Sequence, residues 1–138
     1  MSTSEEITRL FVEAINAHDL DRMRRLLDVD HRLTDSLGTS VQGREAVLAA
    51  WRTYFAWMPD YRIEIEDLLV RGPRVAMFGA ARGTFAPDGA LHGENRWELP
   101  AAWLTEMREN LIASWRIYAD NKSVYEIMER YRARRTDL

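Results

Sequence analysis

Hydrophobic residues in the first third of the chain recur at helical spacing. The apolar face of the first predicted helix consists of Ile7, Leu10, Phe11, Ala14 and Ile15. Thr3 and Glu6 have the spacing of a capping box, so this helix is expected to begin there. Asp19 can cap a second, shorter helix with an apolar face made of Leu20, Met23 and Leu27. A third helix is expected between Gly43 and Pro59, and it would bury Val47, Trp51 and Phe55.

After the second predicted helix, the period changes to that of β-strands. A short strand is predicted in the segment HRLTDSLG, with His31, Leu33 and Asp35 on one face. Longer strands are predicted over 61–70, 74–85, 94–107 and 110–119. Helices followed by consecutive antiparallel strands indicate an α+β fold. We expect a single domain over residues 1–138, with a curved antiparallel sheet that forms a cone (an α+β barrel) closed by the N-terminal helices around a pocket.

Several residues predict where the strands of this sheet bulge or turn. Gly79 and Gly83 lie inside the second long strand and indicate bulges or sharp coiling. Glu109 and Asn110 form the expected tight turn before the last strand. A final helix is predicted to start near Asp120, with an inward face made of Val124, Ile127, Met128 and Tyr131.

Composition and charge narrow the classes of partner. The chain is 46% hydrophobic and 30% charged, which is typical of a globular protein and too apolar for disorder. A formal net charge of -3 disfavours nucleic acid and acidic membranes as partners. The absence of cysteine excludes disulfides and thiolate metal sites, and it fits the cytoplasmic location that we expect.

The sequence points to no metal and no cofactor. His18, His31 and His92 are scattered without metal-ligand spacing, and no glycine-rich phosphate loop is present. We expect His18 at the surface and His31 as a backbone-bonded histidine that can also add a polar group to the pocket.

Three segments carry a pattern that belongs to a known family. Residues 11–23 read FVEAINAHDLDRM, residues 34–47 read TDSLGTSVQGREAV, and residues 97–120 read WELPAAWLTEMRENLIASWRIYAD. In this order and spacing they resemble SnoaL-like proteins, in the ketosteroid-isomerase-like branch of the nuclear-transport-factor-2-like superfamily. The resemblance implies a helix-lined cone around a small-molecule pocket, and a homodimer that forms through the sheet.

The resemblance also implies roles for individual residues. In ketosteroid isomerases the general base is the aspartate of the D-x-x-G segment, and Asp35 stands at the matching place. The tyrosine and aspartate of their oxyanion hole match Phe11 and Ala102, and a further pocket tyrosine matches Trp51. Because neither Phe11 nor Ala102 can donate a hydrogen bond, authentic steroid isomerase activity is not expected. The water-holding residues of limonene-epoxide hydrolases match Pro100, Ala102 and Ile117, so that reaction is not expected either.

Asp35 is the candidate catalytic residue. Next to Phe11, Trp51 and Trp115 its carboxyl group would lose solvent, which suits proton transfer near neutrality. Arg32 is expected on the opposite strand face and Arg44 beyond the loop, so neither should pair with Asp35. The alternative is that Asp35 forms an Asx-turn into the SLGTS loop. Asp120 could lie at the cavity rim, but it also has the position of a helix cap.

The isomerase-like register predicts which faces line the cavity. The predicted lining residues, besides Asp35, are Phe11, Ile15, His31, Trp51, Phe55, Glu98, Ala102, Leu104, Trp115, Ile117 and Ala119. On the third long strand this register turns Trp97, Leu99, Ala101 and Trp103 outward. Such an exposed apolar row requires a partner, and we expect a homodimer through Trp97 and Trp103.

Two hypotheses of function remain open. The first is a cofactor-independent enzyme of isomerase, cyclase or dehydratase type, in which Asp35 transfers a proton on an apolar, carbonyl-containing substrate. The alternative is a non-catalytic module that binds an apolar ligand or assembles as a dimer.

Overall fold

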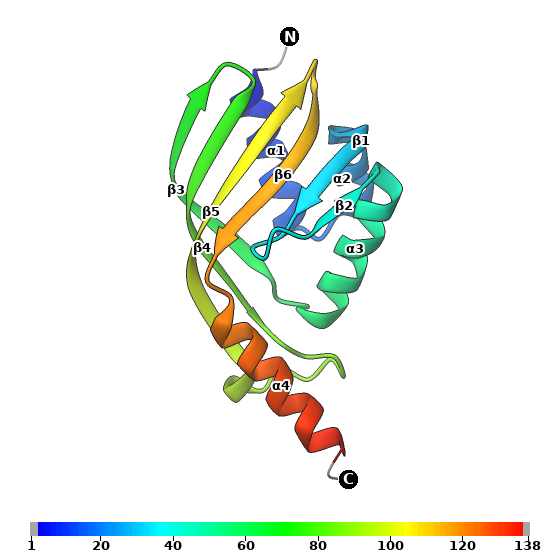
Figure 1. The fold of residues 1–138 in the computed structure, drawn as a ribbon, viewed down its shortest axis with the longest axis vertical. Coiled ribbons are helices and arrows are strands. Elements are labelled where there is room, and N and C mark those ends of the chain that lie inside the picture. The colour runs from blue at the N-terminus through cyan, green and yellow to red at the C-terminus, as the bar shows by residue number, and fades with distance from the viewer. Residues whose placement is uncertain (1–2, 137–138) are drawn as a thin grey trace.

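The computed structural model describes residues 3–136, which form four α-helices and a six-stranded sheet (Figure 1). The helices are α1 (Ser4–Asn16), α2 (Leu20–Leu26), α3 (Arg44–Trp57) and α4 (Lys122–Thr136), with a short 3-10 helix η1 (Gly93–Asn95). The strands are β1 (Leu27–Thr34), β2 (Ser40–Gln42), β3 (Arg62–Arg71), β4 (Arg74–Thr84), β5 (Arg96–Arg108) and β6 (Leu111–Ala119).

The helices begin where their capping residues predict. The Thr3 side chain accepts a hydrogen bond from the Glu6 backbone N–H, and the Asp19 carboxylate accepts one from the Arg22 N–H. The predicted inward face of α1 is correct except at Leu10, which is exposed. Thr8 is buried on that face instead, because its hydroxyl bonds to the Thr105 hydroxyl across a distance of 2.9 Å.

The sheet has the order β2-β1-β6-β5-β4-β3 and is curved but not closed (Figure 1). The α+β fold is therefore confirmed, with two differences from the expected antiparallel sheet. Strand β1 pairs with β6 in parallel, and the short strand β2 adds an antiparallel edge that the sequence did not predict. In Figure 1, α1 and α2 lie behind the sheet, α3 lies beside it, and α4 extends from its lower end.

The two glycines of β4 have different roles. The register of β3 shifts between Ile65 and Asp67, opposite Gly79, so the predicted bulge is present on the neighbouring strand. A Cβ atom at Gly79 would lie 1.8 Å from the Glu64 carbonyl oxygen, which only glycine avoids. Gly83 is paired regularly with Trp97, and it leaves room for the Trp97 ring that packs over it.

The prediction for the faces of β5 was wrong by one residue. Trp97 and Trp103 are only 5% and 1% exposed, so they point inward, whereas Glu98 is exposed on the outer face. The reason is the pairing with β6, in which Trp103 lies opposite Ile117. Directly paired residues of antiparallel strands share a face of the sheet, so an inward Ile117 requires an inward Trp103. Trp97 and Trp103 therefore do not form the expected dimer surface.

Helix α4 closes one end of the inner face. Its predicted inward residues Val124 and Ile127 are buried, and the Tyr131 ring meets the edge of Phe85 with 5.3 Å between ring centroids. The helix is also tied to η1, because the Arg134 guanidinium donates to the Glu94 carboxylate across 2.8 Å. This ion pair lowers the pKa of Glu94. Within the described residues, no helix is long and apolar enough to cross a membrane.

Candidate ligand pocket

A cavity of about 330 Å³ lies between α3, α4 and the inner face of the sheet. Most of its wall is apolar or aromatic: Leu33, Val41, Ala50, Trp51, Trp57, Met58, Ala81, Trp97, Leu99, Ala101, Trp103, Ile117, Ala119, Val124 and Met128. Its polar lining residues are Asp35, Ser36, Tyr54, Tyr61, Asn121 and Tyr125. An apolar wall with a few polar groups is the usual form of a small-molecule site.

The structure brings together only part of the predicted site. Asp35, Trp51, Ile117 and Ala119 line the cavity as predicted. Five other predicted residues are buried in the hydrophobic core or beside it without lining the cavity: Phe11, Ile15, His31, Phe55 and Trp115. They are displaced from the site because α1 packs directly on the sheet, and the Phe11 ring meets the Trp115 ring with 5.1 Å between centroids.

Three predicted lining residues lie on the outer face of the sheet: Glu98, Ala102 and Leu104. The one-residue offset on β5 explains all three. Glu98 lies near Arg82, with 3.9 Å between carboxylate and guanidinium, instead of adding a second carboxylate to the cavity. The inward positions next to Ala102 are Ala101 and Trp103.

Asp35 follows the last residue of β1; it holds a loop turn and also lines the cavity. Its Oδ1 atom accepts hydrogen bonds from the backbone N–H groups of Leu37 and Thr39, both at 3.0 Å. These bonds form the Asx-turn that holds the loop, in which Gly38 has a φ of 85°. Asp35 is half-buried and also lines the cavity.

The two basic neighbours of Asp35 in sequence bind elsewhere, as expected. The Arg32 Nε atom donates to the Gln42 side chain, and Arg44 pairs with Glu45. Within residues 3–136 no salt bridge involves Asp35, and none of the described residues that line the cavity is basic. The part of the cavity wall that the structure describes is therefore mostly apolar and carries one carboxylate without a cation.

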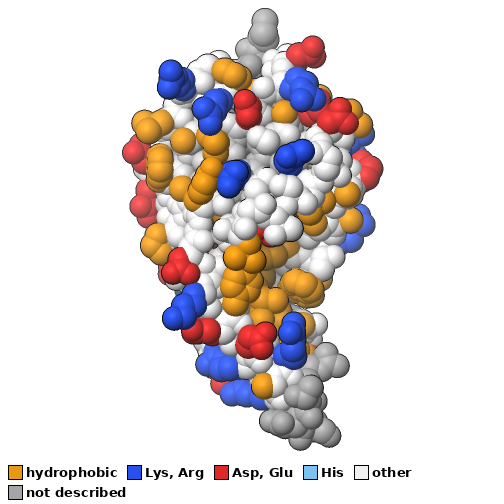
Figure 2. Space-filling view, viewed as in Figure 1, with side chains coloured by type: hydrophobic (Ala, Val, Ile, Leu, Met, Phe, Trp, Pro, Cys, Tyr) orange, Lys and Arg blue, Asp and Glu red, His pale blue; other side chains and the backbone are white. Residues whose placement is uncertain are grey.

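The loop at Asp35 is joined to the start of α4. The Asn121 side-chain amide donates to the Ser36 hydroxyl across 2.7 Å, and both residues line the cavity. Figure 2 shows hydrophobic side chains gathered in this region, between the end of α3 and the start of α4. Trp57 and Tyr125 are among the exposed large hydrophobic residues that line the cavity, so they mark its opening.

Two tyrosines of the cavity were not predicted from the sequence. Tyr54 lies on α3 and Tyr61 in the loop before β3, and their rings meet edge to face with centroids 4.9 Å apart. Burial raises the pKa of Tyr54 and that of Tyr61 well above the usual value. The signal for Tyr54 was its position three residues after Trp51, which places both on one side of α3.

The histidines have structural positions. The His31 Nδ1 atom is hydrogen-bonded to the Ile112 carbonyl at 2.8 Å, and burial lowers the pKa of His31. His18 was expected at the surface, but its ring stacks on Phe55 and its Nε2 atom bonds to the Tyr61 carbonyl. In the part of the chain that the structure describes, no three His, Asp or Glu residues are grouped to hold a metal ion.

Asp120 lies at the start of α4 and not in the cavity. Its carboxylate accepts a hydrogen bond from the Lys122 backbone N–H at 3.0 Å. It borders a shallow surface hollow with Tyr125 and Glu126, outside the cavity wall. The helix-start role that its sequence position indicated therefore accounts for its contacts.

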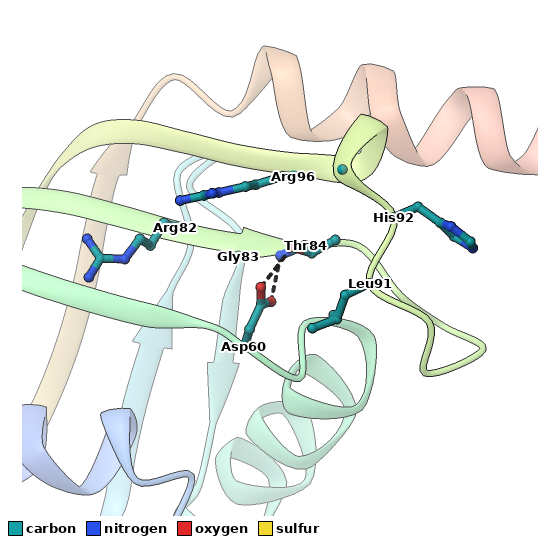
Figure 3. Close-up of a pocket in the computed structure, with 8 residues that line it drawn as sticks. Asp60, Arg82, Gly83, Thr84, Leu91, His92 and Arg96 are labelled. Carbon is teal, nitrogen blue, oxygen red and sulfur yellow. Dashed lines mark hydrogen bonds between the residues drawn. The ribbon is translucent and has the colours of Figure 1, made fainter.

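A second hollow lies beside the loop after α3 (Figure 3). Asp60 accepts hydrogen bonds from both the backbone N–H and the hydroxyl of Thr84, each at 2.7 Å. In Figure 3 the guanidinium groups of Arg82 and Arg96 point away from Asp60, and His92 points in the opposite direction. Asp60 thus ties the loop to the end of β4, and the charged groups around it do not converge on one point.

The sequence model of the SnoaL-like domain matches residues 8–115, which is most of the chain. The chain belongs to the SnoaL-like domain family. No curated protein matches it in sequence. The family assignment agrees with the curved sheet and with the pocket between the sheet and the helices.

Solved structures of nuclear-transport-factor-2-like proteins share the fold. IdmH from Streptomyces antibioticus, described as a candidate polyketide cyclase, is 23% identical to this chain, with a TM-score of 0.76. The match covers 93% of this chain and 99% of IdmH. A protein with a ketosteroid isomerase-like fold from Catenulispora acidiphila, in complex with trimethylamine, is 22% identical, with a TM-score of 0.74. The match covers 86% of this chain and 88% of that protein. An LEH-like epoxide hydrolase from M. tuberculosis is 16% identical, with a TM-score of 0.75. The match covers 92% of this chain and 90% of that protein.

Proposed function

We propose that this protein is a cofactor-independent enzyme that transfers a proton on an apolar, carbonyl-containing substrate, with Asp35 as its acid and base. The proposal rests on one observation: among the described residues that line the cavity, Asp35 is the one carboxylate. Similarity to proteins described as candidate polyketide cyclases supports a reaction of isomerase, cyclase or dehydratase type.

The contacts of Asp35 suit this role. The two backbone N–H groups on Oδ1 hold the carboxylate in one orientation, while Oδ2 has no hydrogen bond within the described residues. In the proposed step, Oδ2 takes a proton from the carbon next to the substrate carbonyl, and the C–H electrons form an enolate. Return of the proton to another carbon completes an isomerisation. Alternatively, the enolate carbon attacks a second carbonyl of the same molecule, and the proton goes to the new alkoxide.

The test is hydrogen–deuterium exchange at the acidic carbon of β-tetralone, a neutral bicyclic ketone, followed by NMR in deuterated buffer. We expect the protein to accelerate exchange and Asp35→Asn to reduce that acceleration at least about 100-fold, the lower range for a general base. Asparagine can still accept the two loop hydrogen bonds, so the turn is preserved. Asp120→Asn serves as the matched control and should exchange at the wild-type rate.

The alternative function is a binding module without chemistry, and it is favoured by the use of Asp35 Oδ1 in the loop turn. In that case β-tetralone binds without accelerated exchange in the wild type. Full acceleration in Asp35→Asn would instead show an enzyme whose acid or base is another group.

We propose in addition that two copies pair through the outer face of the sheet. Strand pairing aligns Phe78, Ala102 and Tyr118 across that face, and Phe78 and Tyr118 are 43% and 48% exposed. Standard interfaces bury on the order of 1,600 Å². Sedimentation should therefore show a dimer at micromolar concentration and a monomer for Phe78→Lys. A monomeric wild type would contradict the pairing.

A further inference from the structure

Three tyrosines line the cavity from three different segments. Tyr54 comes from α3, Tyr61 from the loop before β3, and Tyr125 from α4. Tyr125 is 40% exposed at the opening, whereas Tyr61 is 6% exposed in the interior. The three residues therefore extend from the opening of the cavity into the protein.

The hydroxyl groups of Tyr54 and Tyr61 have no hydrogen-bond partner among the described residues. The Tyr54 and Tyr61 rings meet edge to face with 4.9 Å between centroids, so these two residues are neighbours in the cavity wall. Both residues line the cavity, so a ligand there that accepts a hydrogen bond would give these hydroxyl groups a partner.

Other polar groups of the wall are donors as well. The indole N–H groups of Trp51 and Trp103 are buried without a hydrogen-bond partner in the described structure. The third indole of the wall differs, because the Trp97 N–H points to the Met58 sulfur at 3.3 Å. These indole nitrogens are closed off from solvent, whereas the tyrosine hydroxyl groups belong to residues that line the cavity, and such donors favour oxygen acceptors over hydrocarbons.

Charge restricts the ligand further. The described residues of the wall include no Lys, Arg or His, and they include the carboxylate of Asp35. An anion would enter an apolar cavity with no cation to compensate its lost hydration. The favoured ligand therefore presents neutral oxygen acceptors.

We propose that Tyr54, Tyr61 and Tyr125 are the specificity-determining residues of the cavity, and that they select neutral apolar molecules with a carbonyl oxygen. This inference rests on the proposed function of the same cavity and assigns the substrate class to particular hydroxyl groups. The tyrosines bind the acceptor oxygen, and the aromatic wall holds the hydrocarbon part.

The experiment compares three probes: β-tetralone, its analogue in which a methylene group replaces the carbonyl oxygen, and the anion β-naphthoate. Binding is followed by quenching of tryptophan fluorescence, since Trp51, Trp97 and Trp103 line the cavity. We expect the ketone to bind about 3- to 10-fold more tightly than the methylene analogue, as one or two net hydrogen bonds give. Binding of β-naphthoate should be weaker than that of either neutral probe.

The variants Tyr61→Phe and Tyr54→Phe each remove a hydroxyl and keep the ring. Each should reduce the ketone preference toward equality, with unchanged affinity for the methylene analogue as evidence of an intact cavity. Tyr131→Phe, on α4 but outside the cavity wall, keeps the ring that packs on Phe85; it is the matched control and should keep the wild-type preference. Equal binding of both neutral probes by the wild type, or an unchanged preference in both pocket variants, would overturn this inference and leave the apolar pocket in place. Tighter binding of β-naphthoate than of the ketone would overturn it too. Failure of all three probes to bind would overturn the proposed function together with the inference.

Discussion

The inner face of the sheet is covered in two different ways. Under α1 lies a packed end, defined by Phe11, Ala14, Ile15, His31 and Trp115, all of which are almost completely buried. Toward α4 lies an open end, the cavity wall at Tyr61, Trp97, Leu99 and Ala101. The same strands β5 and β6 run through both ends.

The position of the cavity therefore depends on the covering helices and not on the strands. Helix α1 places Phe11 directly against Trp115, and the Thr8 hydroxyl bonds to Thr105 on the sheet. Helix α4 is tied at points near its two ends, through Asn121 to Ser36 and through Arg134 to Glu94. Close packing of α1 removes space at one end, whereas at the other end Val124, Tyr125 and Met128 of α4 line a cavity that remains open.

The largest loss of stability is expected when a large side chain at the packed end is replaced by alanine. Phe11→Ala should lower the free energy of unfolding by about 3–5 kcal/mol, because it leaves a void among side chains that cannot collapse. Trp57→Ala, at the opening of the cavity, removes a partly exposed ring and should cost clearly less. Urea denaturation measures both values. Equal losses would contradict the division into a packed and an open end.

A smaller loss of stability is expected when a side chain at either end is enlarged. Ala14→Leu at the packed end should cost about 1–3 kcal/mol, because no space is available for the added atoms. Ala101→Leu at the open end should cost less, since the new side chain enters the cavity, and it should abolish binding of β-tetralone. Denaturation and fluorescence titration check the pair. Retained binding in Ala101→Leu would place the ligand elsewhere.

The smallest effect on stability is expected from protonation of His31, at the packed end, as the pH is lowered. Burial lowers the pKa of His31, so the folded state keeps the imidazole neutral while the unfolded chain takes up a proton. Stability should therefore be complete above the ordinary pKa of about 6.5 and fall as the pH decreases from there, by at most about 1.4 kcal/mol per pH unit for this group. The nearby Asp28 opposes this shift, but burial dominates.

Urea midpoints at about pH 7 and pH 5 test the role of His31, because the ordinary histidine pKa lies between them. The variant His31→Asn cannot take up the proton and should lose less stability than the wild type between the two values. An identical loss in both proteins would mean that other groups cause the acid sensitivity.

Local signals predicted most of the elements correctly. The caps at Thr3 and Asp19, the break after Trp57 and the turn at Glu109 all depend on residues within four positions of one another. Glu109 has a φ of 58°, as the tight turn between β5 and β6 requires. The bulge opposite Gly79 was also foreseen, since a glycine inside a strand marks a close approach of backbones.

The candidate site was predicted less completely. Asp35 and Trp51 were found through their place in family-like segments, and both line the cavity. Tyr54, Tyr61 and Asn121 were missed because they meet only when α3, its following loop and α4 are brought together in space.

The amino-acid sequence by itself determined the helices, most of the strands, their turns and the SnoaL-like family of this protein. It could not determine which face of β5 points inward, because residues 99–104 are apolar at almost every position and alternate positions do not differ in polarity. Only the pairing of Trp103 with Ile117 decided that face, and only the covering of the sheet by α1 and α4 decided where the cavity lies. Local structure follows from neighbouring residues, whereas a cavity is the space that distant residues leave unfilled.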